Sequence, residues 1–173
     1  MEDCNQAETA ASGSSPACWC ISKGLAGMVS QMKGLAQALE IPFQCMETRL
    51  RFPWSLVPTS LLPQSTFVLR NPDQIRQRPP RIVISCGRHG VVPALWLKRR
   101  FGHQIYTVHI QDPCVDPSGF DMVIVPRHDR IRGENVYLTN GAIHHITPQV
   151  LRTAADSALA KSLADGRPVV AVL

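Results

Sequence analysis

The sequence lacks any long run of apolar residues. A helix that crosses a bilayer needs about 20 consecutive, mainly apolar residues, and no run in these 173 residues approaches that length. Residues 1–16 are acidic, small and polar without an apolar stretch, which excludes a secretory signal peptide. We therefore expect a cytoplasmic protein, whose contact with a membrane surface, if it makes one, is peripheral.

The residue spacings of a metal site are also missing. The chain has six cysteines but no CxxC motif and no His-x-x-x-His pair. Cys18 and Cys20 would share one face of a strand, and Cys86 ends another apolar run, so we expect these thiols to fill space as small apolar side chains. Without a secretion signal, reduced thiols are the default state. We expect neither a metal nor a cofactor.

The sequence has few clusters of consecutive residues with the same charge. The net charge of +5 and the pI of about 9.1 favour an anionic partner such as a nucleotide, a phosphate or a lipid headgroup. The one dense basic run, Lys98-Arg99-Arg100, falls at an expected helix end, where cations offset the helix dipole. It therefore does not predict a nucleic-acid surface, and we expect no nucleic-acid partner.

What the chain does contain is an alternation of strand-like and helix-like segments. Its length and its hydrophobic content of 45% suit one globular domain with a core. Short apolar runs predict strands at residues 17–21, 44–48, 81–85, 104–110, 120–125 and 135–138. Between them, apolar spacings of three and four predict a helix from about Met28. Alternation of this kind predicts an α/β fold, a Rossmann-like parallel sheet with helices on both faces.

Proline and glycine mark other element ends. Pro93 is expected to open a second helix and Gly102 to close it. A third, long helix is expected to begin at Thr147-Pro148 and to stop at residues 165–168. Between residues 43 and 69, Pro53, Pro58 and Pro63 forbid one long helix. We expect this stretch, with Trp54, to pack under the sheet rather than form a hydrophobic surface for a membrane or partner.

The domain boundaries follow from these segments. Residues 1–16 are expected to be a disordered leader and residues 17–147 a Rossmann-like N-terminal domain. Residues 148–173 are expected to be a linker helix and a final strand. That strand, from Pro168 to Leu173, is either the edge of this domain or the first strand of a second, missing domain. We favour the second interpretation, because the other half of a cleft is otherwise lacking.

Polar clusters follow three of the predicted strands directly: Cys86-Gly87-Arg88-His89, Gln111-Asp112-Pro113 and Arg127-His128-Asp129. Open α/β sheets bind ligands beyond the carboxyl ends of their strands. The turns at residues 22–31 and 86–90 each join a strand to a helix, so free N–H groups could face an anion. Neither turn is a Walker A or a GxGxxG motif, and each alone is more typical of a tight turn. Arg88 strengthens the second case, because its guanidinium can donate paired hydrogen bonds to a phosphate or carboxylate.

Candidate site residues come from these clusters. The expected ligand-binding residues are Gly24, Gly27, Gln31, Ser85, Gly87, Arg88, Gln111, Asp112 and Gly141. The candidates for proton transfer are His109, His128 and Asp129, because each histidine has a carboxylate nearby in the sequence. Two alternatives stay open: His109 could be a hydrogen-bonded core residue, and Asp112 could cap a turn.

In combination, several segments resemble the mitochondrial-fission Elm-type family, over most of residues 19 to 151. These segments are Gly24-x-x-Gly27-Met28-x-x-Gln31-x-x-Gly34-Leu35-Ala36, Ile84-Ser85-Cys86-Gly87-Arg88, Val108-His109-Ile110-Gln111-Asp112-Pro113, Phe120-Asp121, Pro126-x-His128-Asp129 and Asn135-Val136-x-x-Thr139-x-Gly141-Ala142. None of them is specific alone.

The resemblance implies a chain that looks like the N-terminal domain of a GT-B glycosyltransferase. In that class a second domain supplies most nucleotide-sugar contacts, and the first supplies acceptor contacts and often a base. The first loop lacks the glycine-rich, histidine-ending loop of lipid-linked sugar transferases, so no base is carried over. A nucleotide-sugar or phosphate-containing ligand would need the second domain, and this chain alone would be inactive. The family's plant member is described as a fission factor. The alternative function is therefore a non-catalytic interaction module with a protein or membrane partner.

Overall fold

The computed structural model describes residues 16–163. Within them, six strands form one sheet in the order β2-β1-β3-β4-β5-β6, and every neighbouring pair is parallel. The predicted α/β class with a Rossmann-like parallel sheet is confirmed, and each predicted strand in this range overlaps an observed one. The strands are β1 (Cys18–Ser22), β2 (Phe43–Glu47), β3 (Ile82–Cys86), β4 (Tyr106–Ile110), β5 (Met122–Pro126) and β6 (Val136–Thr139).

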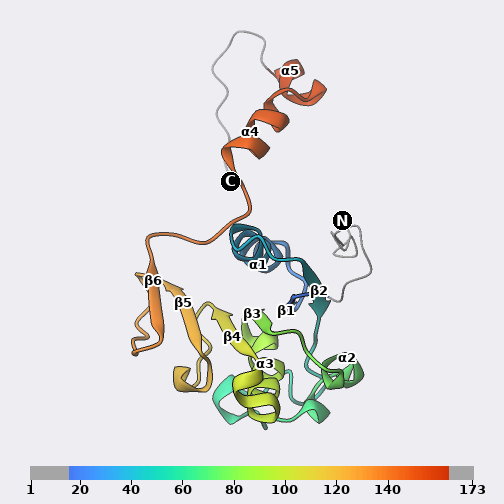
Figure 1. The fold of residues 1–173 in the computed structure, drawn as a ribbon, viewed down its shortest axis with the longest axis vertical. Helices are drawn as coiled ribbons and strands as arrows, with labels where there is room; N and C mark the ends of the chain where they lie inside the picture. Colours follow the sequence, from blue (N-terminus) through green and yellow to red (C-terminus); the bar gives the residue numbers. More distant parts are fainter. Residues whose placement is uncertain (1–15, 164–173) are drawn as a thin grey trace.

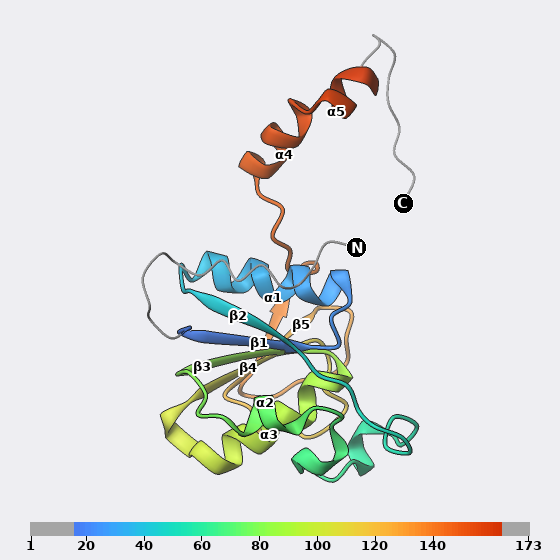
Figure 2. The ribbon, with the colours of Figure 1, turned by 90° about the vertical axis from the view of Figure 1, so that its right-hand side faces the viewer.

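Helices cover both faces of the sheet, as predicted (Figure 1). α1 (Ala26–Ala38) lies on one face, and α3 (Arg88–Phe101) with the short α2 (Pro72–Arg76) lies on the other. Figure 2 shows α4 (Pro148–Ala155) and α5 (Ala158–Leu163) beyond α1, extending away from the sheet. Single 3₁₀ turns occur at Thr59–Leu61, Thr66–Val68, Gly102–Gln104 and Pro117–Gly119. Among the residues described, no helix is long and apolar enough to cross a membrane.

The central strands β1, β3, β4 and β5 are mainly apolar because both of their faces are largely buried, whereas the edge strands β2 and β6 are partly exposed. Under α1, alternate strand residues such as Cys20 and Ile84 pack against Met32. On the α3 side, the intervening residues Ile21 and Val83 pack with other apolar side chains. Hydrogen bonds to the neighbouring thiols of Cys18 and Cys45, with burial, raise the pKa of Cys20, and burial raises the pKa of Cys86 to about 12. These thiols therefore stay protonated.

The prediction that Pro93 opens the second helix is wrong. α3 begins at Arg88, after Gly87 in a left-handed conformation (φ 66°), and Pro93 lies inside it. A proline within a helix deprives the carbonyl four residues earlier of its donor, which here is that of His89. Thr48, just after β2, donates its hydroxyl to the His89 carbonyl at 3.0 Å and replaces the missing bond. Gly102 does end the helix, as predicted.

The single long helix predicted from Thr147 is also wrong, because two helices occupy its place. Thr147 caps α4 by accepting a hydrogen bond from the Val150 N–H at 3.2 Å. Ser157 accepts one from the Ala160 N–H at 3.1 Å, so its hydroxyl starts a new helix instead of continuing the old one. The expected leader up to residue 15, the helix stop at 165–168 and the final strand lie outside the described residues.

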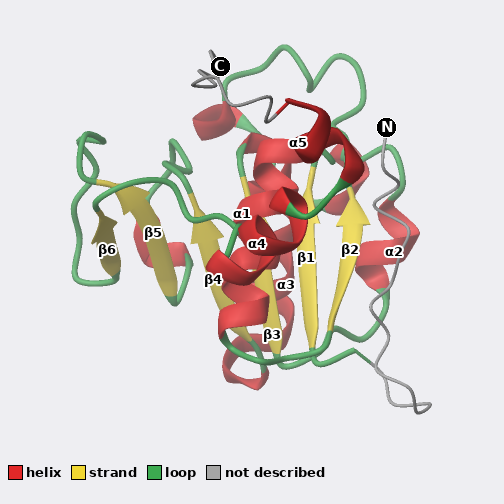
Figure 3. Ribbon diagram, turned by 90° about the horizontal axis from the view of Figure 1, so that it is seen from above, coloured by secondary structure: helices red, strands yellow, loops and turns green. Residues whose placement is uncertain are grey.

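The segment between β6 and α4 crosses directly over α1 (Figure 3). Ile143 packs into the core under α1, and the Ser30 hydroxyl lies 2.7 Å from Nδ1 of His145. Gly34 makes the close approach possible, since a Cβ added there would lie 2.5 Å from the His144 carbonyl oxygen. This crossing positions the start of α4.

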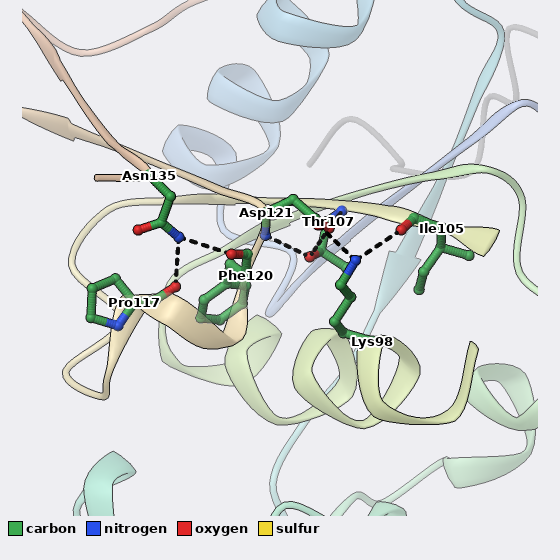
Figure 4. Close-up of polar contacts among 7 residues, drawn as sticks. All are labelled: Lys98, Ile105, Thr107, Pro117, Phe120, Asp121 and Asn135. Carbon is green, nitrogen blue, oxygen red and sulfur yellow. Dashed lines mark hydrogen bonds and ion pairs between the residues drawn. The ribbon is translucent and has the colours of Figure 1, made fainter. Parts of the chain in front are cut away.

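The amino edge of the sheet is held by an ion pair shielded from solvent (Figure 4). Nζ of Lys98 lies 2.6 Å from Oδ1 of Asp121 and also donates to the Ile105 carbonyl at 3.2 Å. Oδ2 of Asp121 accepts from the N–H and the hydroxyl of Thr107. Burial alone would raise the pKa of Asp121, but the hydrogen bonds from Lys98 and Thr107 outweigh it and hold that pKa below its usual range. The pair joins α3 to β4 and β5, opposite the carboxyl edge.

Gly34→Ala should lower stability, whereas Gly27→Ala should raise it. A Cβ at Gly27 meets nothing within 4 Å, so this change gains helix propensity of up to about 1 kcal/mol. At Gly34 the same gain is opposed by the clash with His144. Urea unfolding and amide exchange at residues 143–147 would measure both effects. Equal stabilisation by the two substitutions, with unchanged exchange, would contradict the crossing.

Candidate functional site

The strand order reverses between β1 and β3. The chain leaves β1 through α1 on one face to reach β2, and leaves β3 through α3 on the other face to reach β4. In open α/β sheets, a ligand binds beyond the carboxyl ends of the strands at such a reversal. The first turn of α1 and the tips of β3 and β4 meet here: a Cβ added to Gly87 would lie 2.6 Å from Cε of Met28 and 3.4 Å from Oε1 of Gln111.

The loop after β1 presents backbone donors. Gly24 has a φ of 84°, and its N–H donates to the Ser22 hydroxyl at 3.1 Å. α1 then begins, and no side-chain hydrogen bond from its N-cap residue Leu25 satisfies the first N–H groups. Gly27 lies exposed in the first turn and Gln31 lies half-buried one turn later. The positive end of α1 is therefore open toward the carboxyl edge.

A basic cluster surrounds this edge at His89. Nδ1 of His89 accepts a hydrogen bond from the Leu50 N–H at 3.0 Å. Burial lowers the pKa of His89 to about 4, and the positive charges of Lys23, Arg88 and Arg49 lower it further in the same direction. His89 is therefore neutral near pH 7, and three cations from the β1, β2 and β3 ends act on one point. Sequence reasoning missed Lys23, Arg49 and His89, although Lys23 and His89 adjoin predicted site residues.

Arg88 faces the loop after β2. Its guanidinium donates to the carbonyl of Ser55 at 2.9 Å, to that of Trp54 at 3.1 Å and to that of Val57. Its Nε is buried and has no partner among the described residues. To hold an anion, Arg88 would have to exchange some of these carbonyls for the ligand, so its ligand role stays a prediction.

Ser85 and His109 form a buried pair between β3 and β4. The Ser85 hydroxyl lies 2.8 Å from Nδ1 of His109, whose ring centroid is 5.0 Å from that of Phe120. Nε2 of His109 is buried without a hydrogen-bond partner in the part of the chain described. Complete burial lowers the pKa of His109 to about 3, so the imidazole is neutral. Its role in proton transfer stays a prediction and would require solvent or substrate to reach it.

The tips of β4 and β5 carry carboxylates. Gln111, with a φ of 82°, donates its N–H to the Ile124 carbonyl at 2.9 Å. Oδ1 of Asp112 accepts from the Cys114 N–H at 2.8 Å, which is the turn-capping geometry left open above. Burial and the negative charges of Asp112 and Asp129 raise the pKa of Cys114, so the two loops are neighbours.

His128 is the accessible histidine of the predicted trio. Its side chain is 82% exposed, and Nε2 lies 3.6 Å from Oδ1 of Asp129, which is 28% exposed. The pair follows β5, and Gly141 follows β6 on the exposed surface. The structure therefore brings Gly87 and Gln111 together beside Met28 of α1 at the reversal, and it places Gly24 against the Glu47 side chain. His128, Asp129 and Gly141 lie further along the same edge.

A cavity of about 800 Å³ lies beside β2 instead of at the reversal. Its lining is mostly polar, and it includes Gln44, Glu47, Arg49, Arg70 and Gln74. We place the candidate site at the reversal because the uncapped helix end and the cations converge there. Arg49, which is ion-paired with Glu47 at 2.6 Å, borders both regions.

His109→Leu should flatten the acid limb of the stability curve. An unfolded histidine binds a proton near pH 6.5, whereas folded His109 does so only near pH 3. Stability is therefore fully present above pH 6.5 and is lost as pH falls toward 3, by up to about 1.4 kcal/mol per pH unit for this group. Urea unfolding between pH 7 and pH 4 would show a shallower slope in the variant.

The matched control is the exposed His103→Leu, which removes an imidazole from the surface. A slope in His109→Leu that equals those of the wild type and of His103→Leu would show that His109 is not buried as described.

Comparisons with known proteins add the following. The family described as Mitochondrial fission ELM1 matches residues 26–173. Mitochondrial fission protein ELM1 of Arabidopsis thaliana is 33% identical over 116 residues, which covers 54% of this chain and 27% of the plant protein. The chain thus spans about a quarter of the length of this curated relative. No solved structure matches.

Proposed function

This chain belongs to the mitochondrial fission ELM1 family, and we propose that it is the N-terminal half of a GT-B glycosyltransferase-like protein that binds an anionic ligand at the β1–β3 reversal. The ligand class is a sugar phosphate, a lipid phosphate or a nucleotide. The observation that carries this proposal is the open N-terminus of α1 at the strand-order reversal, where Met28 of α1 lies against Gly87 at the tip of β3. The positive charges of Lys23, Arg49 and Arg88, which all lower the pKa of His89, support it.

Each part of the site has a physical role in this proposal. The ligand's phosphate faces the first N–H groups of α1, where Gly27 leaves space for a close approach. Lys23 supplies a half-buried positive charge beside them. Gly87 and Gln111 form the opposite wall. The remainder of the ligand extends along the edge toward β4 and β5.

Proton transfer, where a second domain completes the site, falls to His128. Its imidazole is accessible, and the Asp129 carboxylate at 3.6 Å can orient it and stabilise its charged form. His109, buried and neutral, acts in this proposal through Ser85 as a spacer between β3 and β4.

The second candidate is a non-catalytic interaction module that kept the fold and lost the chemistry. One observation favours it: Arg88, a predicted ligand-binding residue, and His109, a predicted proton-transfer residue, are both committed to internal contacts. Fold likeness cannot choose between the two functions.

Lys23→Gln should weaken the binding of pyrophosphate to the full-length protein about tenfold, because a charge-assisted contact is lost. Titration calorimetry with pyrophosphate and with a nucleoside diphosphate would measure this. Lys33→Gln is the matched control, since it removes the same charge from a half-buried position later in α1. Equal losses of affinity in both variants would show that the effect comes from net charge alone. If the wild-type protein does not bind pyrophosphate, the proposed site is wrong.

The 173-residue chain alone should show no sugar transfer, because in the proposed GT-B arrangement a second domain supplies most of the nucleotide-sugar contacts. In the full-length protein, His128→Gln should abolish transfer while leaving anion binding intact. Assays with labelled sugar nucleotides would test both statements. Turnover by the short chain would contradict the two-domain proposal, and full-length turnover unaffected by His128→Gln would remove His128 from its role.

A further inference from the structure

The loop after β2 exposes large apolar side chains that the sequence analysis expected to be packed away. In this apolar loop, residues 52–61, Phe52 is 73% exposed, Leu56 76% and Leu61 71%. Trp54 does pack against the core, and its ring lies edge-on to Phe67 at 5.5 Å. Trp54 therefore anchors the loop, while its neighbours remain in solvent. Figure 2 shows the loop, in teal, beyond the carboxyl end of β2.

The exposure does not come from a loosely held backbone. The N–H groups of Ser55, Leu56 and Val57 donate to carbonyls three or four residues earlier, at 3.0 to 3.3 Å. The guanidinium of Arg88 also donates hydrogen bonds to the carbonyls of Trp54, Ser55 and Val57. A backbone whose polar groups are satisfied internally can enter an apolar medium without the cost of unpaired groups.

The ends of the loop are fixed as well. The Arg51 N–H donates to the Val68 carbonyl at 2.9 Å, and the Arg70 N–H donates to the Arg49 carbonyl at 2.8 Å. These bonds flank the antiparallel bridge between Leu50 and Leu69. The backbone that carries the three exposed side chains is thus fixed by hydrogen bonds to the rest of the domain.

The surroundings of the loop are positively charged. Residues 48–71 contain Arg49, Arg51 and Arg70 and no aspartate or glutamate. The guanidinium of Arg51 lies over the Phe67 ring, 5.8 Å from its centroid. Among the described residues, Arg49 is the one of these that is ion-paired, with Glu47 before the segment. Apolar side chains with a basic rim complement a bilayer that carries anionic headgroups.

We propose that the apolar loop docks the chain on the surface of an anionic bilayer. Phe52, Leu56 and Leu61 enter the boundary between headgroups and acyl chains, and the arginines face lipid phosphates. Three side chains supply only a fraction of the roughly 800 Å² per partner that a stable protein interface buries. A bilayer, by contrast, is bound through few apolar side chains together with charge. The inference does not rest on the proposed anion site at the β1–β3 reversal, although Arg49 and Arg88 belong to both regions.

Co-sedimentation with vesicles tests the proposal. The chain should bind vesicles of phosphatidylcholine mixed with phosphatidylglycerol, bind pure phosphatidylcholine far less, and lose binding as salt is raised. Leu56→Ser and Phe52→Ser should each lower the partition coefficient about tenfold. Tyr137→Ser is the matched control, because Tyr137 is 54% exposed on β6 and should leave binding unchanged. Circular dichroism confirms that each variant folds, and unchanged pyrophosphate binding by Leu56→Ser keeps the two sites distinguishable.

Tryptophan placement gives a direct readout of insertion. Fluorescence of Leu56→Trp should be quenched by brominated lipids more strongly than that of the wild type, whereas Tyr137→Trp should add no quenching. Three results would overturn the proposal: no binding of the wild type to anionic vesicles, wild-type binding by Leu56→Ser, or loss of binding with Leu151→Ser, which would place the contact on α4. A dimer of the wild type that Leu56→Ser dissociates would instead assign the loop to self-association.

Discussion

The parallel pairing of β1 with β3 is the constraint on which the rest of the structure depends. Parallel strands need crossover connections, and these crossovers are almost always right-handed. Because β2 and β4 lie on opposite sides of the β1–β3 pair, α1 and α3 are forced onto opposite faces. Both helices then begin at the same edge, so the first turn of α1 meets the tip of β3, where Met28 lies against Gly87. The position of the candidate site therefore follows from the strand order alone, whatever side chains line it.

Arg88 extends that constraint to the neighbouring loop. A half-buried guanidinium such as that of Arg88 is costly unless its donors are paired. Three carbonyls of the apolar loop pair its terminal nitrogens. The tip of β3 and the loop after β2 thus hold each other in place. The anion site and the proposed lipid contact share this one side chain, which makes Arg88 a poor choice for testing either one alone. Substitutions at Lys23 or Leu56 separate them.

The sequence predicts the sheet well because each buried strand is a short, continuous apolar run that needs no distant information. Prediction from the sequence fails where a residue interacts with a partner that is distant along the chain. Nothing near Pro93 indicates that Thr48 supplies the hydroxyl that lets the helix begin at Arg88. The pairing of Ser85 with His109 likewise depends on strand register, so sequence alone left His109 open between base and core. The break between α4 and α5 does have a local signal, because serine is a favoured N-cap residue and Ser157 occupies that position. The regular spacing of the leucines, however, predicts one continuous helix across the break.

Charge divides the carboxyl edge into two halves, and this division orients a ligand. Lys23, Arg49 and Arg88 act at the β1–β3 end, where Glu47 beside Gly24 offsets part of their charge through its ion pair with Arg49, whereas Asp112 and Asp129 act at the β4–β5 end. An anionic group is attracted to the first half and repelled from the second. The proposed ligand therefore places its phosphate at the reversal and its uncharged part near His128. Such a pose keeps the accessible imidazole away from the phosphate and beside the part of the ligand where a hydroxyl proton would have to move.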